Sequence, residues 1–593
     1  MSKISKSTIL LLILLAVCIA SQPAEAETSI YVFSPDQSLV VKTGGFAGVH
    51  ETYTVAGLFR LTFDPDAGIA SFEIVDANLS DETGAEYGQN LDEIFNMTDL
   101  SGSVIDDIAI QFEGKTADGT ENDVSLKLSL IDDSAHLTGN TTPPPNSADM
   151  FFYDIDAVAT KKYAVGTGEP NDPYQIATAG DLMLLGETPD DYDKHFILTA
   201  DIDLDPNLLG RKVFDRAIIA PDVNDTDFYY EFQGIPFSGV FNGNGHTISH
   251  LTIEGISNLG LFGQLQEQGE VSNVGLAAVN VNGIYGIGAI LGDNLGGSIA
   301  DSSSNGSVNG NWFVGGLVGN NSVGSIINCC STGMVTGKGD IGGLVGHNGY
   351  PERSNAVLAN CYSTAIASGG YRVGGLAGSN DKGSITTCFS AGAVTGIGDV
   401  GGLVGNNSVG SITNSYSTGN VSGDEVVGGL VGWNYNGSIA MSYSIGTVTG
   451  KWIVGGLVGY NAESSINISY SSSEVIGHGY IGGLIGCNED SNITMSYSSG
   501  VVTGNEDVGG LVGYNWLSSS DVGSTTFSFW DMESSGQTTS AGGEGKTTSE
   551  MQTASTFLEA GWDFMDETNN GTVDIWWILE GQDYPRLWWE THD

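Results

Sequence analysis

The sequence predicts an all-β protein built around a parallel β-helix, and three observations lead to that class. The string VGGLVGNNSVGSI occurs at 314–326 and again, unchanged, at 400–412. Strings related to its GGLVG core recur at a nearly constant period through the second half of the chain. Glycine and β-branched residues fill each repeat and leave no apolar period of 3.6 residues, which argues against helices.

The period is measured at the aliphatic residue of each GGLVG-like string. The successive gaps are 29, 27, 27, 32, 27, 27, 27, 27 and 27 residues. The positions are Leu261, Ile290, Leu317, Leu344, Leu376, Leu403, Leu430, Leu457, Leu484 and Leu511. Ten copies at one period indicate a solenoid, and the excess in the gap of 32 predicts an outward loop at 349–354.

Each repeat contains three strand-like segments separated by turns, with the patterns VGGLVG, GSIxxSYS and xVTG. Three strands per repeat make one coil of a β-helix. Because parallel strands lie about 4.8 Å apart, ten coils predict a rod roughly 45 Å long.

Stacking the coils aligns equivalent residues into columns. We expect a buried aliphatic column of Ile299, Ile326, Ile385, Ile412, Ile439, Ile466 and Ile493. A second column contains Val308, Val335, Ile366, Val394, Val421, Val448, Val475 and Val502. We interpret a third column as turn-forming, because asparagine tolerates left-handed geometry and stacked amides can hydrogen-bond: Asn294, Asn321, Asn348, Asn380, Asn407, Asn434, Asn461, Asn488 and Asn515.

An aromatic column has an orientation that the pattern leaves open: Tyr362, Phe389, Tyr416, Tyr443, Tyr470, Tyr497 and Phe529. Strict alternation would point these rings inward with the isoleucines. The residue before each ring is uniformly small, however, which also indicates a tight interior. Cys329, Cys361 and Cys388 replace serine at that small position and are therefore interpreted as packing residues.

The chain divides into five predicted segments. Residues 1–26 have the basic start, apolar stretch and Ala-Glu-Ala end of a cleaved signal peptide. Residues 27–162 alternate in the manner of an antiparallel, sandwich-like β-domain. Residues 163–255 lead into the solenoid with a capping helix near 179–186, 256–530 form the β-helix, and 531–593 form the C-terminal cap with a helix near 549–559.

Composition limits the partners. The net charge of −52 argues against nucleic acid and anionic membranes and fits a secreted, well-solvated protein. No stretch after the signal peptide is apolar enough for membrane insertion. Five cysteines remain after signal removal, an odd number without CxxC spacing, so neither a disulfide framework nor a zinc site is expected.

Signatures of catalysis are weak. The segment His246–His250 has the spacing of a peptidase HExxH motif but carries threonine in place of the glutamate base. Asp340, Asp399 and Asp507 share a column on non-adjacent coils, so the carboxylate cluster of a polysaccharide lyase or hydrolase is not evident. No catalytic residue or required cofactor is predicted.

Two weak calcium sites are predicted, and the lesser one is a loop with Asp566, Asn569, Gly571 and Asp574. Asp201, Asp203 and Asp205 alternate along one strand, which points all three carboxylates to one face, where they could hold Ca²⁺. Solvated strand acids are the competing interpretation.

Turn positions vary between repeats while strand positions do not. Six aromatic residues at these variable positions are the predicted ligand contacts: Trp312, Tyr371, Trp433, Trp452, Tyr460 and Tyr514. Exposed aromatic residues on a rigid scaffold suit an extracellular polysaccharide or a surface protein. Trp433 and Tyr460 stand on adjacent coils, so we expect their rings about 5 Å apart and stacked under one extended ligand.

The repeats resemble the GLUG-motif family of secreted and cell-surface bacterial and archaeal proteins. The resemblance extends over GTGEPNDPYQIATAGDLMLLG, HFILTADIDLD, FSGVFNGNGHTISHLTI and WWILEGQDYPRLWW. It implies a right-handed β-helix and an adhesive, extracellular role, although such repeats also accompany large peptidases. The sequence therefore predicts a non-catalytic, secreted or cell-surface binding protein, with a lyase-like enzyme and a calcium-dependent structural protein as alternatives.

Overall fold

The computed structural model describes the strands between Glu27 and Lys161 as backbone only. It describes residues 163, 165–208, 212–223, 232–350, 355–516, 523–565 and 574–590 in full. The predicted signal peptide lies outside the described residues. The chain divides into two compact units, Met1–Val165 and Gly166–Asp593. Within the described part, no helix is both long enough and apolar enough to cross a membrane.

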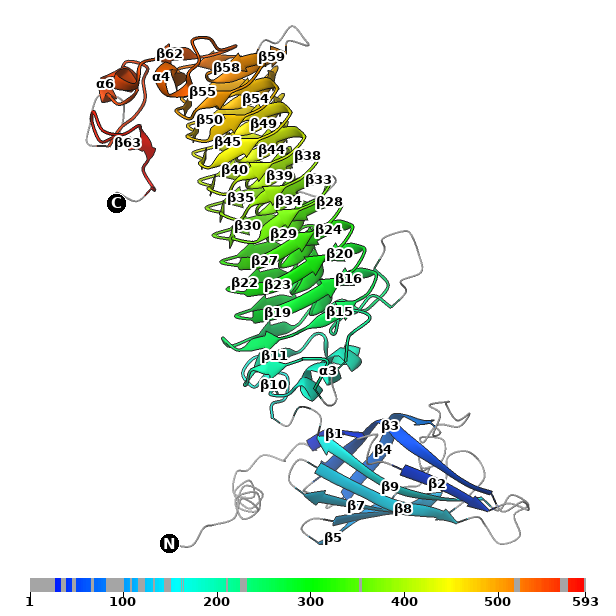
Figure 1. Cartoon of the computed structure of the whole chain (residues 1–593). Helices are drawn as coiled ribbons and strands as arrows, with labels where there is room; N and C mark the ends of the chain where they lie inside the picture. Colours follow the sequence, from blue (N-terminus) through cyan, green and yellow to red (C-terminus); the bar gives the residue numbers. More distant parts are fainter. Residues whose placement is uncertain are drawn as a thin grey trace. The chain divides into compact units, whose positions relative to one another are not determined.

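The N-terminal unit is a nine-stranded antiparallel sheet (Figure 1). Strands β1 and β2 lie end to end between β3 and β9, and each of them pairs with both neighbours. The order continues from β9 through β8, β7 and β6 to β5, while β4 pairs with the other side of β3. Strands β4 and β5 also contact each other, so the single sheet curls back on itself where two separate sheets of a sandwich were predicted. The bounds are β1 Glu27–Phe33, β2 Leu39–Gly44, β3 Val49–Asp64, β4 Ile69–Ser80, β5 Ser101–Asp106, β6 Ala109–Lys115, β7 Asp123–Ile131, β8 Ser134–Thr142 and β9 Phe151–Lys161.

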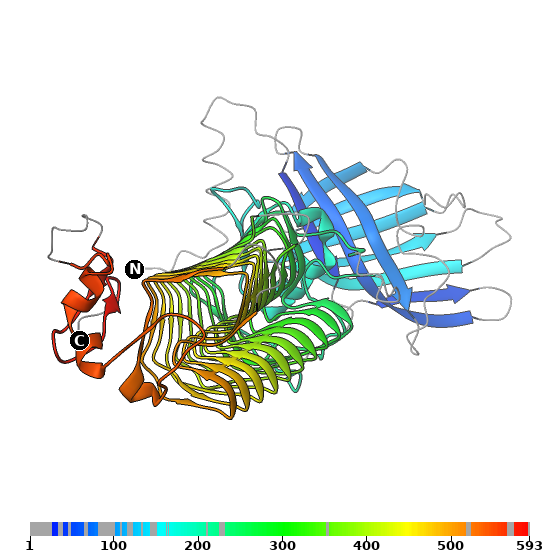
Figure 2. The same cartoon turned by 90° about the horizontal axis from the view of Figure 1, so that it is seen from above.

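The second unit is the parallel β-solenoid that the repeat predicts, and its coils superpose closely when viewed along the stack (Figure 2). Four parallel sheets run along it. They extend from β10 (Tyr174–Ile176) to β60 (Thr525–Thr526), from β12 (Ile202–Asp203) to β62 (Glu544–Lys546), from β16 (Ser257–Leu259) to β58 (Glu506–Gly509), and from β17 (Phe262–Gln266) to β59 (Val512–Trp516).

One coil contains five short strands rather than three. They are β38 (Gly398–Gly401), β39 (Val404–Ser408), β40 (Ser411–Thr413), β41 (Tyr416–Ser417) and β42 (Val421–Ser422). The VGGLVG segment divides at a corner between β38 and β39. A Cβ on Gly401 would lie 1.9 Å from the Val404 carbonyl oxygen, so only glycine permits this approach.

The predicted Ile column is confirmed, since its members are paired in register and no more than 1% exposed. The Val column differs at one coil, because Ala367, not Ile366, pairs with Val394. Ile366 is 46% exposed. Ala367 keeps the 27-residue spacing to Val394, and the longer side chain one position earlier made Ile366 look like the core residue.

The asparagine column is not turn-forming as predicted. Asn407 lies within β39, is fully buried, and does not adopt a left-handed conformation. Its amide Nδ2 donates to Asn434 Oδ1 at 2.7 Å, and equivalent bonds of 2.7–2.9 Å link the column from Asn294 to Asn488. The left-handed residues stand two positions later instead, as at Val409 with φ 56°.

A left-handed residue also decides the orientation of the aromatic column. Asn414 has φ 50°, which turns the chain between the inward Ile412 and the inward Ser415. Alternation then resumes with Tyr416 outward and Ser417 buried. The rings therefore face out, and the small residues on both sides of them face the interior.

The two ends of the solenoid are covered by different means. At the N-terminal end, helix α3 (Ala179–Glu187) begins at a Thr178 capping box and buries Leu182 and Leu185. At the C-terminal end, β61 (Phe529–Asp531) and α4 (Met532–Ser535) follow the last coil. The predicted C-terminal helix is broken into α5 (Thr548–Met551) and α6 (Ala554–Leu558), which precede β63 (Trp576–Trp577) and β64 (Arg586–Leu587).

Candidate functional site

The turn before each GGLVG-like string contributes to one continuous column, which we call the turn ridge. Its members are paired in register on consecutive coils: Tyr285, Trp312, Gly339, Tyr371, Gly398, Glu425, Trp452, Gly479 and Glu506. Three predicted ligand contacts, Trp312, Tyr371 and Trp452, lie here and are 38%, 52% and 38% exposed. The ridge therefore presents aromatic surface at three points along one line.

Trp312, Tyr371 and Trp452 are each followed, one coil later, by a glycine, whereas Tyr285 is followed by Trp312 and packs against Phe313. A Cβ on Gly339 would lie 2.1 Å from Trp312 Cζ3, and a Cβ on Gly479 would lie 2.3 Å from Trp452 Cζ3. At Gly398 the nearest atom would be Tyr371 Cδ1 at 3.1 Å. The rings thus lie over the backbone of the next coil, and they occupy or border the space that a side chain there would need.

Three of the few basic residues of the solenoid stand beside this ridge in sequence. The region 256–530 holds five, namely Lys338, Arg353, Arg372, Lys382 and Lys451. Lys338 precedes Gly339, Arg372 follows Tyr371, and Lys451 precedes Trp452. Lys451 Nζ lies 2.6 Å from Asp424 Oδ1, and the exposed Glu425 and Glu506 belong to the ridge itself. Acidic residues still outnumber basic ones along the ridge, because Asp340, Asp399, Asp424 and Asp507 also stand on or beside it.

A buried charged cluster lies beneath the ridge at Tyr371, and the sequence did not predict it. Arg372 lies 3.0 Å from Asp340 Oδ2, and Ser379 Oγ donates to the other oxygen of the same carboxylate. His347 Nε2 lies 3.3 Å from Asp381 Oδ2, while its Nδ1 is 3.6 Å from Asp340 Oδ1. The second distance is too long for a hydrogen bond, so that interaction is coulombic.

Two pKa values in this cluster are raised, and the causes differ. Burial alone would lower the pKa of His347, but the carboxylates of Asp340 and Asp381 raise it to about 9. Burial raises the pKa of Asp399, on the coil after Arg372, to about 6. Asp340 has no exposed surface, so it cannot reach a substrate and serves to hold Arg372 and His347 in place. A cue was present in sequence, because Arg372 stands between Asp340 and Asp399 in one column.

The other three predicted contacts lie in a neighbouring column, where Trp433 pairs with Tyr460 and Cys487 with Tyr514. The expected common stack of Trp433 and Tyr460 is wrong, because their ring planes are 80° apart at a centroid distance of 5.8 Å. The Tyr460 hydroxyl donates to Glu489, which turns that ring away from the indole. Tyr514 lies against Tyr480 at 5.0 Å. These rings do not share one flat surface.

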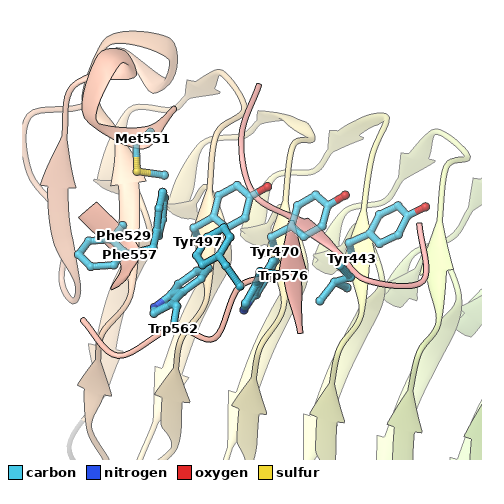
Figure 3. Close-up of a cluster of buried hydrophobic side chains, with 10 residues drawn as sticks. Tyr443, Tyr470, Tyr497, Phe529, Met551, Phe557, Trp562 and Trp576 are labelled. Atoms are coloured by element: carbon cyan, nitrogen blue, oxygen red, sulfur yellow. The ribbon is translucent and has the colours of Figure 1, made fainter. Parts of the chain in front are cut away.

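The outward Tyr/Phe column is a continuous stack. From Tyr362 to Tyr497, successive ring centroids are 4.9–5.0 Å apart and the planes differ by 4–10°. The C-terminal segment folds back along the flank and covers the later rings with Met551, Phe557, Trp562 and Trp576, as Figure 3 shows. Tyr497 and Tyr470 are fully buried, whereas Tyr362 is 37% exposed. Most of this aromatic surface is therefore occupied by the chain itself.

A cavity of about 570 Å³ opens where this cover ends, between Phe389 and Tyr416 on the solenoid and Trp589 on the C-terminal segment. Its basic residue, Arg586, is already engaged, because the guanidinium donates to Asp583 at 3.2 Å and to the Tyr470 hydroxyl at 3.0 Å. The polar groups at this cavity thus serve mainly to fasten the C-terminal segment.

The predicted calcium residues share one outer face, with Ile202 and Leu204 buried between them. Asp201 Oδ1 accepts the Thr247 backbone N–H at 2.9 Å and contacts His246, and both interactions lower the pKa of Asp201. His250 lies 2.8 Å from Asp203 and, together with the Asp205 backbone N–H, lowers the pKa of Asp203. Asp205 instead accepts from the backbone N–H and side-chain amide of Asn207.

Among the fully described residues, no group of three or more His, Cys, Asp or Glu side chains is placed to hold a metal ion. The two histidines of the peptidase-like spacing each face a different aspartate. Calcium binding at Asp201, Asp203 and Asp205 therefore stays a prediction, without a preformed cluster in its favour.

These features define the class of protein: a parallel β-solenoid of 27-residue coils with an antiparallel β-domain before it. Two of its coils, 423–449 and 477–503, match the GLUG motif. The repeats therefore carry the GLUG motif, as their resemblance to that family implied.

Similar proteins were found by sequence and by structure. Halomucin from Haloquadratum walsbyi is 30% identical over 182 residues, which are 30% of this chain and only 2% of halomucin. A solved structure described as a putative immunoglobulin A1 protease from Bacteroides ovatus shares 18% identity at a TM-score of 0.28, over 72% of this chain and 95% of that one. A second, described as IgA1 Protease, shares 10% identity at a TM-score of 0.25, over 93% of this chain and 33% of that one.

Proposed function

We propose that this chain is an exported, non-catalytic protein that binds an extracellular polysaccharide along the turn ridge. The observation that carries the proposal is the placement of Trp312, Tyr371 and Trp452, three exposed aromatic residues in one register column. Most positions that repeat without change are buried and maintain the coil. The exposed turns differ between coils, and an exposed, variable surface on a rigid scaffold is where specificity is expected.

The experiment is a glycan-array and surface-protein screen of the mature chain, residues 27–593. The test variant is the triple substitution Trp312→Ala, Tyr371→Ala and Trp452→Ala. The matched control is Trp433→Ala with Tyr460→Ala, which removes two rings that do not share a flat surface. We expect polysaccharide binding by the parent and the control and its loss in the triple variant. Full binding by the triple variant would exclude the turn ridge as the site.

Two rival functions have their own measurements. A lyase-like enzyme would release unsaturated sugars from acidic polysaccharides, and the buried position of Asp340 disfavours it. A calcium-dependent structural protein would show a large rise in melting temperature on adding Ca²⁺. Substituting asparagine for Asp201, Asp203 and Asp205 together would abolish that rise.

A further inference from the structure

The glycines of the turn ridge give more information than its aromatic residues alone. Gly339, Gly398 and Gly479 do not have positive φ angles, so their backbone would accept any residue. At Gly339 and Gly479 the three nearest atoms to an added Cβ all belong to the indole of the preceding coil. Glycine is therefore needed at these two positions because a ring lies there.

This distinguishes the turn-ridge glycines from those at the corners of the coil. An added Cβ on Gly342 or Gly346 would meet backbone atoms at 1.9 and 2.5 Å, respectively. Those glycines allow the coil to fold. Gly339 and Gly479 instead allow an indole to lie down on the solenoid while 38% of its surface stays exposed. A ring held in this way is preorganised, so a ligand that stacks on it immobilises fewer rotamers on binding.

We infer that Trp312, Tyr371 and Trp452 are three separate stacking platforms for an extended, uncharged polysaccharide that runs parallel to the solenoid axis. This inference rests on the proposed function and adds the ligand class and its direction. Trp312 and Tyr371 are two coils apart and Tyr371 and Trp452 three, so the platforms are spaced by roughly 10 and 14 Å at 4.8 Å per coil. A ligand that reaches two platforms must be longer than one sugar.

The surroundings favour a polysaccharide over a peptide. Peptides that add to a sheet need a free strand edge, and β24 (Trp312–Gly315), β33 (Tyr371–Gly374) and β48 (Trp452–Gly455) are each paired on both sides. The C–H face of a sugar ring needs only a flat aromatic surface. Asp424, Glu425, Glu506 and Asp507 outnumber Lys338 and Lys451 along the ridge, and the whole chain has a net charge of −52, so a polyanion is disfavoured and an uncharged chain avoids this repulsion.

The test displaces the indoles of Trp312 and Trp452 without removing them, by the double substitution Gly339→Ala with Gly479→Ala. The three atoms nearest to each new methyl group belong to an indole and not to the backbone, so the solenoid should keep its melting temperature while both platforms are displaced. We expect affinity for a neutral polysaccharide that the parent binds to fall roughly tenfold or more, as in Trp312→Ala with Trp452→Ala. The control is Gly275→Ala, whose Cβ would have the Thr247 hydroxyl as its nearest neighbour at 3.3 Å, and it should bind as the parent does.

A length series of the same saccharide tests the direction. We expect weak binding of one- and two-sugar fragments and a steep rise once a fragment spans two platforms, because the second contact is then intramolecular. Three results would overturn the inference while leaving polysaccharide binding intact: equal affinity for all lengths, parent-like binding by both glycine and tryptophan variants, or binding of acidic polysaccharides alone. If the parent binds no polysaccharide at all, the proposed function itself is refuted.

Discussion

Two of the outward aromatic columns of the solenoid, the Tyr/Phe column and the turn ridge, differ in what surrounds each ring. In the Tyr/Phe column the rings occupy consecutive coils, stack on one another and are largely covered by the C-terminal segment. In the turn ridge Trp312, Tyr371 and Trp452 are each followed by a glycine on the next coil and are 38–52% exposed. Both columns repeat at the same period on the same scaffold.

The difference shows that an outward aromatic residue on a β-solenoid is not by itself a binding residue. Tyr470 is equivalent in register to Tyr362, yet Tyr470 is fully buried and Tyr362 is 37% exposed. A stacked and covered ring stabilises the coils. A ring that lies over a glycine at the surface contributes less to the fold and leaves part of its surface for a ligand, although Trp452 also contacts His478 and Tyr480.

The largest effect is expected at the covered end of the Tyr/Phe column. Tyr497 is fully buried against Trp562 and Trp576, and its hydroxyl donates to the Pro585 carbonyl at 2.6 Å. Tyr497→Ala should lower the free energy of unfolding by about 3–5 kcal/mol, since it leaves a large cavity. Urea denaturation measures this loss. A loss below about 1 kcal/mol would mean that the C-terminal segment does not cover this ring in solution.

The charged cluster beneath Tyr371 should make stability depend on pH. The folded state raises the pKa of His347 from 6.5 to about 9, so its contribution is full below pH 6.5 and is lost as the pH rises through about 9. The free energy of unfolding should fall by on the order of 3 kcal/mol across this window. Denaturation at several pH values, with His347→Gln as the control, measures the slope. If the free energy of unfolding of the parent depends on pH as little as that of the variant, His347 does not have a raised pKa in the folded state.

The uncovered end of the Tyr/Phe column should behave differently from Tyr497. Tyr362 stacks on Phe389 at 4.9 Å and remains partly exposed. Tyr362→Ala should cost about 1 kcal/mol or less, the typical contribution of one aromatic pair. The comparison with Tyr497→Ala in the same denaturation assay tests whether coverage, rather than stacking, sets the stability of this column. Equal losses at the two positions would contradict that explanation.

The smallest effect on stability is expected in the turn ridge. Trp312→Ala removes an exposed ring that fills no interior space and should change the free energy of unfolding by only about 0.5 kcal/mol. The same variant should bind polysaccharide more weakly than the parent. A loss of several kcal/mol with unchanged binding would place Trp312 with the structural rings instead.

Much of the candidate site could be predicted from the sequence, because the period assigns each residue to a column. The six aromatic contacts were identified by their variable turn positions, but their ring geometry was not. The sequence does contain one signal for the platforms: Gly339, Gly398 and Gly479 stand 27 residues after Trp312, Tyr371 and Trp452, respectively. The T-shaped geometry of Trp433 and Tyr460 left no such signal, since it depends on the distant Glu489.

The sequence by itself determined the number of coils, their period and the buried aliphatic columns, because each of these is a repeated local pattern. The tertiary structure alone decided which way the Tyr/Phe column faces. That orientation depends on left-handed residues at one corner of each coil, where Thr387, Asn414, Met441, Ile468 and Met495 all have φ between 47° and 54°. A β-branched residue such as Ile468 strongly disfavours this conformation in isolation. The backbone hydrogen bonds between neighbouring coils hold it there, and no local sequence pattern records them.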